Sequence, residues 1–467
     1  MAHLLGDEYA AFVLALEQKP ISGLRVNTLK LSAEEFSKLS PYPLGDKIPW
    51  CDAASIIPNS DFAFGKHPYH LAGLYYLQDP SAMSAATLLD PQPGDRVLDL
   101  AAAPGGKTTQ LAALMQGQGL LVANEIKDKR VGHLAVNVER WGAGNIVITN
   151  ESPERLADHF GPFFDRVLVD APCSGEGMFR KDMGARRDWS PEMVAGCAVR
   201  QRNILRVAAK LVRPGGYLLY STCTFAPEED EGVINGLLSG FTDENGFGQF
   251  EVVALPQMQG FMRGKPEWLE SSGEGLEGAV RLFPHRVIGE GHFACLLKRT
   301  SSTDFLADPR NGTDWGAADQ LDGLSTVQER LWQSFVGEVL KVDFAADRLR
   351  VRGERLYFIP ENMPDCGNLR VVHPGVWLGT FKKERFEPAH PLALFLKPGQ
   401  AQNMLDLPSS VEATGWSLLQ AYLRGETIPS DGAPGWLLIT VDGWPLGWGK
   451  RVQGIIKNHF PRGWNIN

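Results

Sequence analysis

The chain has 467 residues, of which 43% are hydrophobic and 22% are charged, and its formal net charge is −9. This length exceeds what one hydrophobic core usually organises, so we expect several domains, and the negative charge excludes indiscriminate binding of nucleic acid by the whole surface. Its six cysteines include no Cys-x-x-Cys pair, which excludes a disulfide framework and the common zinc motifs, and we predict no metal site.

No window of the sequence approaches the roughly 18 continuous apolar residues of a membrane span. The first eight residues include two acids and lack the basic and apolar regions of a secretion signal. We therefore expect a cytoplasmic protein with no membrane partner. We also expect it to act as a monomer.

The first 71 residues predict a small α/β extension. Residues 8–18 carry apolar side chains at helical spacing. Residues 24–30 alternate apolar and polar side chains, as a half-buried strand does. The outward side chains of that strand depend on its register and include Arg25, Asn27 or Lys30. The pattern alone assigns them to a solvated edge.

A short helix is expected after this strand, because Ser32 and Glu35 have the spacing of a capping box. The Pro- and Trp-rich stretch that follows, up to about Pro68, indicates irregular structure. Both segments belong to the extension and precede the predicted core.

Between residues 72 and 300, short apolar runs alternate with helical patterns, which predicts βαβ units and a parallel sheet with helices on both faces. The expected strands are 97–100, 120–124, 146–149, 167–169 and 217–220, and the expected helices are 82–89, 108–115, 128–141, 153–160 and 195–211. Two later runs, 279–282 and 293–297, can close the sheet as an antiparallel pair. We therefore predict one doubly wound, Rossmann-like α/β domain.

A stretch rich in Ser, Thr, Asp, Gly and Asn, residues 301–320, predicts a domain boundary. An amphipathic helix over 326–340 follows, with alternating strands at 348–352 and 355–359. These elements indicate an intermediate α/β domain of residues 301–400.

Residues 401–467 predict a last, β-rich domain. After Asp442 the charged residues are all basic and include Lys450 and Arg451, and four aromatic residues lie among them. Interleaved basic and aromatic side chains suit contact with RNA. A small aromatic core beneath a solvated face has the same composition, and this alternative stays open.

A glycine-rich turn opens the core domain. It consists of Ala101, Ala102, Ala103, Pro104, Gly105, Gly106 and Lys107. Between a strand and a helix, such a turn lets the backbone approach a nucleotide-like cofactor, which the N–H groups of the helix start can bind. A triphosphate loop needs a glycine where Ala101 stands, and a dinucleotide site prefers G-x-G-x-x-G. S-adenosyl-L-methionine needs only the tight turn, so it is the predicted cofactor.

Three further positions are expected at the carboxyl ends of the strands, where doubly wound sheets bind ligands. Glu125 ends the second strand, at the spacing of an acid that binds ribose hydroxyls. Ser152 follows the third strand, where the adenine edge would lie, and Asp170 ends the fourth. A helix cap is the alternative role for Ser152 and for Asp170. For Asp170 we favour function, because Cys173 follows almost at once.

Two cysteines follow neighbouring strands of the predicted sheet, Cys173 after the fourth and Cys223 after the fifth. The other four cysteines are interpreted as small buried hydrophobes. A thiolate that adds to carbon 6 of a pyrimidine makes carbon 5 nucleophilic enough to take a methyl group, after which the carbon 5 proton leaves and the thiol is eliminated. This chemistry needs one cysteine as nucleophile, and a second can assist proton removal or release.

The segments around the two cysteines carry a resemblance to a known family. Asp-Ala-Pro-Cys173-Ser-Gly-Glu-Gly-Met-Phe-Arg-Lys and Tyr-Ser-Thr-Cys223-Thr-Phe-Ala-Pro-Glu-Glu resemble the paired signatures of the RNA cytosine carbon-5 methyltransferases, the Nop2/Sun family. Gln-Asp-Pro-Ser at 78–81 and the glycine turn complete the match over 72–300. Leu-Arg-Val-Asn-Thr-Leu-Lys at 24–30 and the basic end extend it, as in a bacterial branch that modifies small-subunit (16S) ribosomal RNA and has a PUA-like C-terminal module.

The resemblance implies a class I methyltransferase fold, S-adenosyl-L-methionine as cofactor, and methylation of cytosine carbon 5 in 16S ribosomal RNA. It implies that Cys223 is the covalent nucleophile and that Cys173 helps to release the product. In the related DNA enzymes the Pro-Cys cysteine is the nucleophile, so this assignment depends on the family. Asp170 would hold the base edge or the cofactor. Many relatives have Asp after the third strand, where this chain has Glu151-Ser152.

The implied partner is ribosomal RNA or the small ribosomal subunit. The predicted RNA contacts are six basic residues: Arg25, Lys30, Arg180, Lys181, Lys450 and Arg451. The loop after Cys173 also holds Arg186 and Arg187, with a plain solvated loop as the alternative. The target base must leave its stack to reach a thiol. Two rival functions stay open: the same chemistry on transfer RNA, and a ribosome-assembly RNA-binding protein with a vestigial site.

Overall fold

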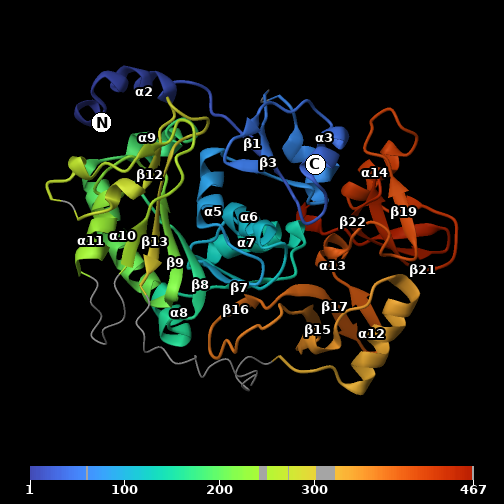
Figure 1. Ribbon diagram of the computed structural model, residues 1–467. Coiled ribbons are helices and arrows are strands. Elements are labelled where there is room, and N and C mark those ends of the chain that lie inside the picture. The colour runs from blue at the N-terminus through green and yellow to red at the C-terminus, as the bar shows by residue number, and fades with distance from the viewer. Residues whose placement is uncertain (59–60, 241–249, 272, 301–320, 465–467) are drawn as a thin grey trace.

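The computed structural model describes residues 1–467 except 59–60, 241–249, 272, 301–320 and 465–467. The domain boundary predicted at 301–320 lies outside the described residues. The described strands form four sheets, which follow one another along the chain apart from one edge strand (Figure 1). Among the described residues, no helix is long and apolar enough to cross a membrane.

The N-terminal part combines short helices with a four-stranded sheet of order β2-β3-β1-β4. Its helices are α1 (Ala2–Leu5), α2 (Tyr9–Leu16), α3 (Ala33–Leu39) and α4 (Pro68–Leu71), and its strands are β1 (Gly23–Val26), β2 (Lys47–Ile48), β3 (Cys51–Ile56) and β4 (Tyr75–Gln78). The predicted capping box begins α3, since Ser32 Oγ accepts the Glu35 N–H at 3.1 Å and the Glu35 carboxylate accepts the Ser32 N–H at 2.7 Å.

Two expectations about this part are wrong. The strand assigned to a solvated edge is β1, which pairs with β3 on one side and β4 on the other, and its four residues are buried. The stretch expected to be irregular contains β3. The alternation of polar and apolar residues reflects side-chain character only, so it could not show that β1 has a paired strand on each side.

The largest sheet has ten strands, in the order β11-β12-β13-β9-β8-β5-β6-β7-β16 with β10 paired to β13. The parallel strands are β5 (Arg96–Asp99), β6 (Leu120–Asn124), β7 (Ile146–Thr149), β8 (Phe164–Asp170) and β9 (Val212–Thr222). The antiparallel strands are β10 (Phe250–Val253), β11 (Met262–Arg263), β12 (Val280–Leu282), β13 (His292–Arg299) and β16 (Val371–His373). The predicted antiparallel pair therefore forms β12 and β13, which extend the sheet beyond β9.

Helices cover both faces of this sheet. They are α5 (Ser84–Leu89), α6 (Gly106–Leu114), α7 (Asp128–Trp141), α8 (Pro153–Phe160), α10 (Pro191–Leu211) and α11 (Glu231–Gly240). The short α9 (Met183–Asp188), in the segment between β8 and α10, has no buried residue. Leu98 of β5 belongs to a core cluster with side chains of α8 and α10, whereas its neighbour Val97 belongs to a second cluster with α5, α6 and α7. Successive residues of a strand point to opposite faces. The predicted doubly wound α/β domain is confirmed.

The C-terminal third holds two further sheets. The first, of order β14-β15-β17-β18, contains β14 (Leu349–Arg352), β15 (Arg355–Phe358), β17 (Val376–Lys382) and β18 (Arg385–Pro388) beside α12 (Thr326–Val339) and α13 (His390–Phe395). The second contains β19 (Met404–Leu407), β20 (Ile428–Pro429), β21 (Gly435–Val441), β22 (Trp444–Val452) and β23 (Ile455–Asn458) beside α14 (Trp416–Leu423). The expectation of a β-rich end is confirmed.

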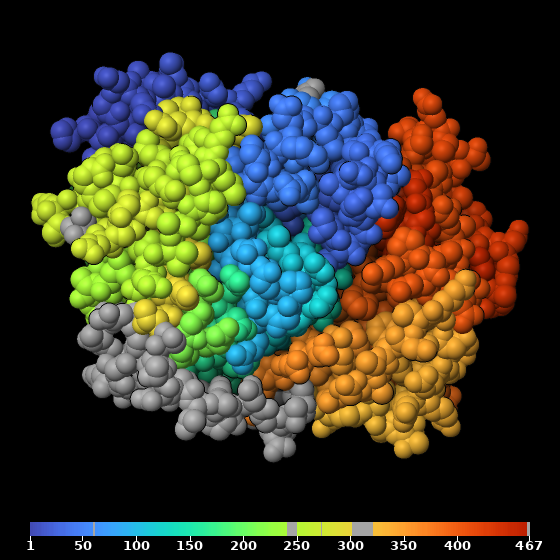
Figure 2. Space-filling model, in the orientation of Figure 1, coloured from blue at the N-terminus to red at the C-terminus, as the bar shows by residue number. Residues whose placement is uncertain are grey.

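The two ends of the chain pack together. Leu24 and Tyr75 of the N-terminal sheet share a core cluster with Leu407, Tyr422 and other residues of the C-terminal part. Figure 2 shows the blue N-terminal and red C-terminal segments in contact beside the central domain. The N-terminal extension is thus held between the ten-stranded sheet and the last β-rich part.

A buried charge cluster ties β12 to the start of α11. Arg281 is 1% exposed, and its guanidinium lies 3.1 Å from Asp230 Oδ2 and donates to Glu231 Oε1 at 2.8 Å. Arg281→Met would leave two buried carboxylates without their cation, so we expect the free energy of unfolding to fall by about 3–5 kcal/mol. Urea unfolding measures this loss, with Arg330→Met on the exposed side of α12 as the control. Equal midpoints for the two variants would contradict the prediction.

Candidate active site

The two cysteines predicted to act together lie side by side in the structure. Cys173 follows β8 and Cys223 follows β9, and these strands are parallel neighbours. Their Sγ atoms are 3.3 Å apart, and both residues are partly exposed. The other four cysteines are buried, as expected. One reacting group at this edge of the sheet can therefore meet both thiols.

The contact between the thiols affects the protonation of Cys173. Its hydrogen bond with Cys223, together with burial, raises the pKa of the Cys173 thiol well above the ordinary value. Cys173 therefore stays protonated near neutral pH and can donate its S–H to the sulfur of Cys223.

Asp170, the last residue of β8, lies at the same edge. Its Oδ2 accepts a hydrogen bond from Lys107 Nζ at 2.8 Å, and its Oδ1 accepts one from Ser221 Oγ at 3.0 Å. Burial by itself would raise the pKa of Asp170, but the charge of Lys107 and the nearby His292 lower it below the ordinary value. The side chain is 31% exposed, so an anionic carboxylate faces the space beside the thiols.

The glycine turn is held from outside by three side chains on two elements. Asn137 of α7 donates to the Pro104 carbonyl at 2.7 Å, Arg130 of α7 donates to the Ala103 carbonyl, and Arg25 of β1 donates to the Gly106 carbonyl at 2.8 Å. Gly105 has φ +111°, and a Cβ there would lie 3.3 Å from Leu134 and 3.4 Å from Asn137. Only glycine suits that position, because both the backbone angle and the close approach of α7 oppose a side chain.

Glu125 lies beside this turn, just beyond β6, and is 2% exposed. Its Oε1 accepts the Lys127 N–H at 2.9 Å, and its Oε2 lies 3.3 Å from Arg130. Oε2 accepts no hydrogen bond from any described residue. A carboxylate oxygen that is held in place but accepts no hydrogen bond is suited to a ligand hydroxyl.

Ser152 has the role of a helix cap in the structure, since its Oγ accepts the Arg155 N–H at 3.3 Å at the start of α8. The neighbouring Glu151 carboxylate pairs with Arg155 at 2.8 Å and accepts the Arg370 N–H at 2.6 Å. Contact of Ser152 with a cofactor stays a prediction.

The structure corrects two of the predicted RNA contacts. Arg25 is 1% exposed and donates to Gly106 and Thr109. The side chain of Arg180 is also 1% exposed and lies 2.5 Å from Glu290. Both guanidinium groups are buried and bonded within the protein, so they hold the N-terminal part and the cysteine loop in place and do not face RNA.

The other four basic positions are more accessible. Lys30 is half-buried, donates to the Ala72 carbonyl at 2.6 Å, and has its pKa lowered to about 7 by burial. Lys181 is exposed, Lys450 lies 5.3 Å from the Trp436 ring centroid, and Arg451 donates to Ser430 at 3.1 Å. RNA contact at these four residues stays a prediction.

The sequence reasoning missed a polar layer beneath the cysteines. Glu229 accepts the Ser174 N–H at 3.0 Å and the Gln201 amide at 2.7 Å. Glu176 accepts the Phe225 N–H at 2.7 Å. Each glutamate therefore fastens the loop of one cysteine to a neighbouring element. The only sequence signal was that both glutamates stand within the quoted cysteine segments.

A second missed contact joins the Gln-Asp-Pro-Ser segment to the cysteine loop. Asp79 Oδ2 accepts the Glu290 N–H at 3.1 Å and the Lys181 ammonium at 3.1 Å. Ser81 Oγ accepts the Gly291 N–H at 3.1 Å. The segment thus sets the position of the loop before β13. Among the described residues, no three His, Cys, Asp or Glu side chains are grouped as metal ligands.

His292, at the start of β13, supplies a test of acid stability. Its Nε2 lies 3.6 Å from Asp170 Oδ1, and burial together with the Lys107 charge lowers the pKa of His292 from 6.5 to about 4. Between these values the unfolded chain binds a proton that the folded chain does not, so stability falls as the pH falls. We expect His292→Phe to reduce the loss of unfolding free energy between pH 7 and pH 5 by about 2 kcal/mol.

Urea titrations at the two pH values measure this difference, and only the change between them is compared. His133→Phe, at an exposed position of α7, serves as the control and should keep the acid loss of the parent protein. An equal acid loss in His292→Phe would contradict the prediction.

Comparison with known proteins places this chain in a family. Residues 86–298 match the family described as 16S rRNA methyltransferase RsmB/F. Residues 1–80 match the N-terminal domain of 16S rRNA methyltransferase RsmF, residues 334–396 match the RsmF rRNA methyltransferase first C-terminal domain, and residues 414–466 match the methyltransferase RsmF PUA domain.

Curated relatives match over nearly the full length. The ribosomal RNA small subunit methyltransferase F of Shewanella sp. (strain MR-4) is 33% identical over 474 residues, which covers 99% of this chain and 94% of that protein. The protein of the same name from Erwinia tasmaniensis is 33% identical and covers 98% of this chain and 93% of its own length.

Solved structures agree with the fold. A methyltransferase homologue from Pyrococcus horikoshii matches with a TM-score of 0.55 and 29% identity, covering 63% of this chain and 91% of that one. NSun6 from the same organism, solved with SFG, matches with a TM-score of 0.52 and 21% identity over 64% of this chain and 97% of that one. The second likeness shows the fold alone.

Proposed function

Because the chain belongs to the RsmF family of 16S rRNA methyltransferases, we propose that it methylates carbon 5 of cytosine in 16S ribosomal RNA with Cys223 as the covalent nucleophile. The observation that carries this proposal is the pair of thiols 3.3 Å apart beside an anionic carboxylate. A methyltransferase that acted on a nucleophilic nitrogen or oxygen would need no thiol, whereas carbon 5 needs covalent activation.

The chemistry follows from the position of each side chain. Cys223 Sγ adds to carbon 6 of the cytosine, and the electrons of the former double bond raise the nucleophilicity of carbon 5, which receives the methyl group. Loss of the carbon 5 proton to solvent water restores the double bond and breaks the bond between carbon 6 and sulfur. The Cys173 S–H, 3.3 Å from the departing sulfur, protonates it and completes the release.

Asp170 is suited to hold the target base. Its carboxylate is anionic, is held by Lys107 and Ser221, and is 31% exposed. The exposed carboxylate can accept a hydrogen bond from the 4-amino group of cytosine. Because a target in a duplex is out of reach, the substrate presents this base flipped or single-stranded.

The predicted cofactor fits the residues around the glycine turn. S-adenosyl-L-methionine, when bound, supplies the methyl group as an activated sulfonium. We propose that the Glu125 carboxylate binds its ribose hydroxyls, a role supported by the buried Oε2 that accepts no hydrogen bond. The remaining proposed contacts are Ala101, Ala102, Ala103, Pro104, Gly105, Gly106, Lys107, Ser152 and Asp170.

Two observations favour this proposal over its rivals. The full-length relatives carry the name of small-subunit rRNA enzymes, which favours ribosomal over transfer RNA. A vestigial site would have no reason to keep two thiols in contact. The match of residues 414–466 to a PUA domain supports a role for the C-terminal region in RNA contact.

Nucleoside mass spectrometry after reaction with 16S ribosomal RNA tests the proposal. RNA and small subunits from cells without this protein are incubated with it and S-adenosyl-L-methionine, with transfer RNA as the parallel substrate. We expect 5-methylcytidine in ribosomal RNA, at positions that bisulfite sequencing locates. Methylation of a cytosine nitrogen, of another base or of transfer RNA alone would overturn the proposal.

A further inference from the structure

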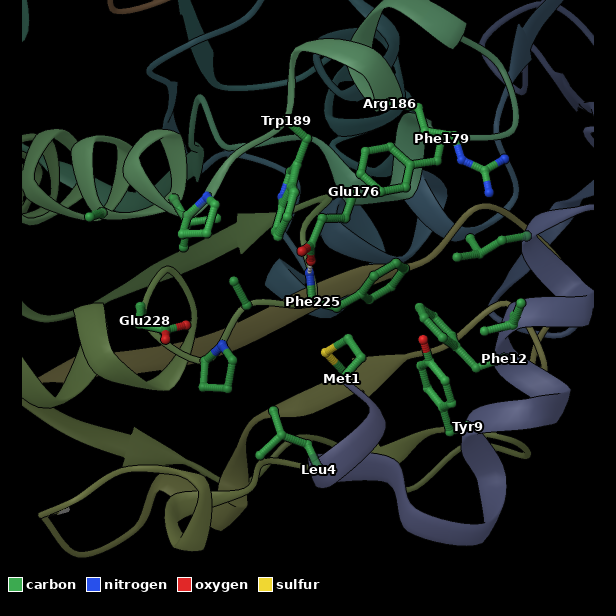
Figure 3. Close-up of a pocket in the computed structure, with 17 residues that line it drawn as sticks. Met1, Leu4, Tyr9, Phe12, Glu176, Phe179, Arg186, Trp189, Phe225 and Glu228 are labelled. Atoms are coloured by element: carbon green, nitrogen blue, oxygen red, sulfur yellow. Dashed lines mark hydrogen bonds between the residues drawn. The ribbon is translucent and has the colours of Figure 1, made fainter.

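A cavity of about 560 Å³ lies between the N-terminal helices and the loops that carry the two cysteines. Figure 3 shows Tyr9 and Phe12 of α2 on one side of it and Trp189 and Phe179 on another, with Phe225 between them. Of these five side chains, Tyr9, Phe179 and Trp189 have exposed ring surface, whereas Phe12 and Phe225 are only 4% and 2% exposed and support the wall of the cavity from behind. Its walls are therefore suited to a planar, aromatic ligand.

The cavity is lined by residues of the two loops that carry the thiols, although neither Cys173 nor Cys223 lines it. Phe225 comes two residues after Cys223, which keeps their Cα atoms within about 7 Å. Glu176 comes three residues after Cys173 and accepts the Phe225 N–H at 2.7 Å, and the Gly177 N–H donates to the Cys223 carbonyl at 2.7 Å. A ligand in the cavity would thus contact the same two loops that hold the thiols.

Polar groups of the cavity match the edges of a nucleobase. The Trp189 indole Nε1 is buried and has no hydrogen-bond acceptor among the described residues. A buried donor without an acceptor is costly, so it marks a place where a ligand acceptor would be favourable. The Glu228 carboxylate also lines the cavity, is exposed, and can accept from an amino group.

Two arginines lie close to the rim of the cavity, where they could meet the phosphate of a nucleotide whose base entered it. Arg186 lines the cavity and is 40% exposed, and the adjacent Arg187 is 79% exposed. They pair with Glu17 and Asp188 at the surface, and such exposed pairs contribute little and can give way to a phosphate. Aromatic walls within and arginines at the rim match a base and its phosphate.

The wall formed by α2 is anchored to the catalytic domain. Phe12 packs edge-on against Phe225 with ring centroids 5.3 Å apart. Glu8 accepts a hydrogen bond from Arg286 at 2.6 Å. A preformed wall lowers the cost of ordering a ligand against it.

We infer that this cavity holds a nucleobase of the substrate RNA that neighbours the target cytosine. The inference rests on the proposed function, because it takes a ribosomal RNA strand as the occupant. Flipping the target base removes a stacking partner from its neighbour, and aromatic side chains bind unstacked bases by stacking. Trp189 Nε1 then donates to an acceptor of the base, and the rim arginines contact its phosphate.

The test is a binding measurement in which a base and a cavity side chain are removed separately and together. Fluorescence anisotropy gives the affinity for a 16S rRNA fragment around the mapped cytosine, with one abasic site at each of the three nucleotides on either side. The protein variants are Tyr9→Ala and Trp189→Phe. Leu14→Ala is the matched control, since Leu14 lies on the same helix, is 67% exposed and does not line the cavity.

At one position we expect the abasic change to weaken binding by about 5- to 150-fold, the range for loss of one stacked base. Tyr9→Ala should weaken RNA binding by a similar factor. The abasic site and Tyr9→Ala together should weaken binding little more than either change alone. Trp189→Phe should weaken binding by about 2- to 10-fold, because it removes one hydrogen bond and keeps a ring. Leu14→Ala should leave all affinities unchanged.

Additive losses at all six positions would overturn the inference. So would a Tyr9→Ala loss of affinity that appears with assembled small subunits but not with the RNA fragment, since a ribosomal protein would then be the occupant of the cavity. Circular dichroism melting checks that Tyr9→Ala, at a 39% exposed position, remains folded. Bisulfite sequencing of the same RNA distinguishes failure of this inference from failure of the proposed function. Normal cytosine methylation without coupling would refute only the inference that a base occupies the cavity. Absence of 5-methylcytosine would refute the proposed function.

Discussion

Cys223→Ala is expected to lower methyl transfer to 16S ribosomal RNA by about 10⁴-fold or more. Without the Cys223 thiolate, no nucleophile adds to carbon 6, so carbon 5 of cytosine does not gain the electron density that it needs. Cys173 cannot take over this role, because burial still raises the pKa of its thiol after its hydrogen-bond partner is removed. Transfer of a labelled methyl group under single-turnover conditions measures the loss.

The affinity for S-adenosyl-L-methionine should not change in this variant, because Cys223 is assigned to the base and not to the cofactor. Calorimetric titration checks that point and also shows that the variant is folded. Cys197→Ala, at a buried cysteine of α10, is the matched control and should retain turnover. Turnover within tenfold of the parent enzyme in Cys223→Ala would remove Cys223 from the nucleophile role.

Cys173→Ala is expected to trap the RNA on the enzyme as a covalent adduct. The variant keeps Cys223, so the bond between sulfur and carbon 6 still forms. It lacks the S–H that lies 3.3 Å from that sulfur and protonates it on release. We expect turnover to fall by about 10²- to 10⁴-fold, the range for loss of a proton donor, while a band of protein joined to RNA accumulates on a denaturing gel.

Two further variants make this result specific. Cys173→Ala combined with Cys223→Ala should give no adduct, because the nucleophile is gone. Cys173→Ser keeps a proton donor at the same place and should release part of the trapped RNA. An adduct that persists in the double variant, or its absence in Cys173→Ala despite lost turnover, would refute the release role.

Local sequence pattern was sufficient for several helices of the catalytic domain. The structure has α7 and α8 over 128–141 and 153–160, the ranges that the periodicity predicted. Each has a local signal at its end: Gly142 in the left-handed conformation after α7, and Ser152 with a proline at the start of α8. Interactions between residues three and four apart carry this information, so it can be read from the chain.

Burial of polar residues could not be read in the same way. Arg25 stands in an alternating strand and looks like a surface residue, yet this strand lies between β3 and β4 and Arg25 donates to the glycine turn. Its partner Gly106 is 81 residues away along the chain. The local sequence pattern does not show which distant group a side chain will bind. The RNA contact expected for Arg25 was wrong for that reason.

The sequence by itself determined the doubly wound fold, the glycine turn and the edge of the sheet at which both cysteine loops lie, because the alternation of strands and helices along the chain and the turn residues between them are local properties. Only the tertiary structure decided that the two thiols are 3.3 Å apart, that α2 closes a cavity against their loops, and that the ends of the chain share one core. These are contacts between segments that are distant in sequence, and packing alone sets their distances.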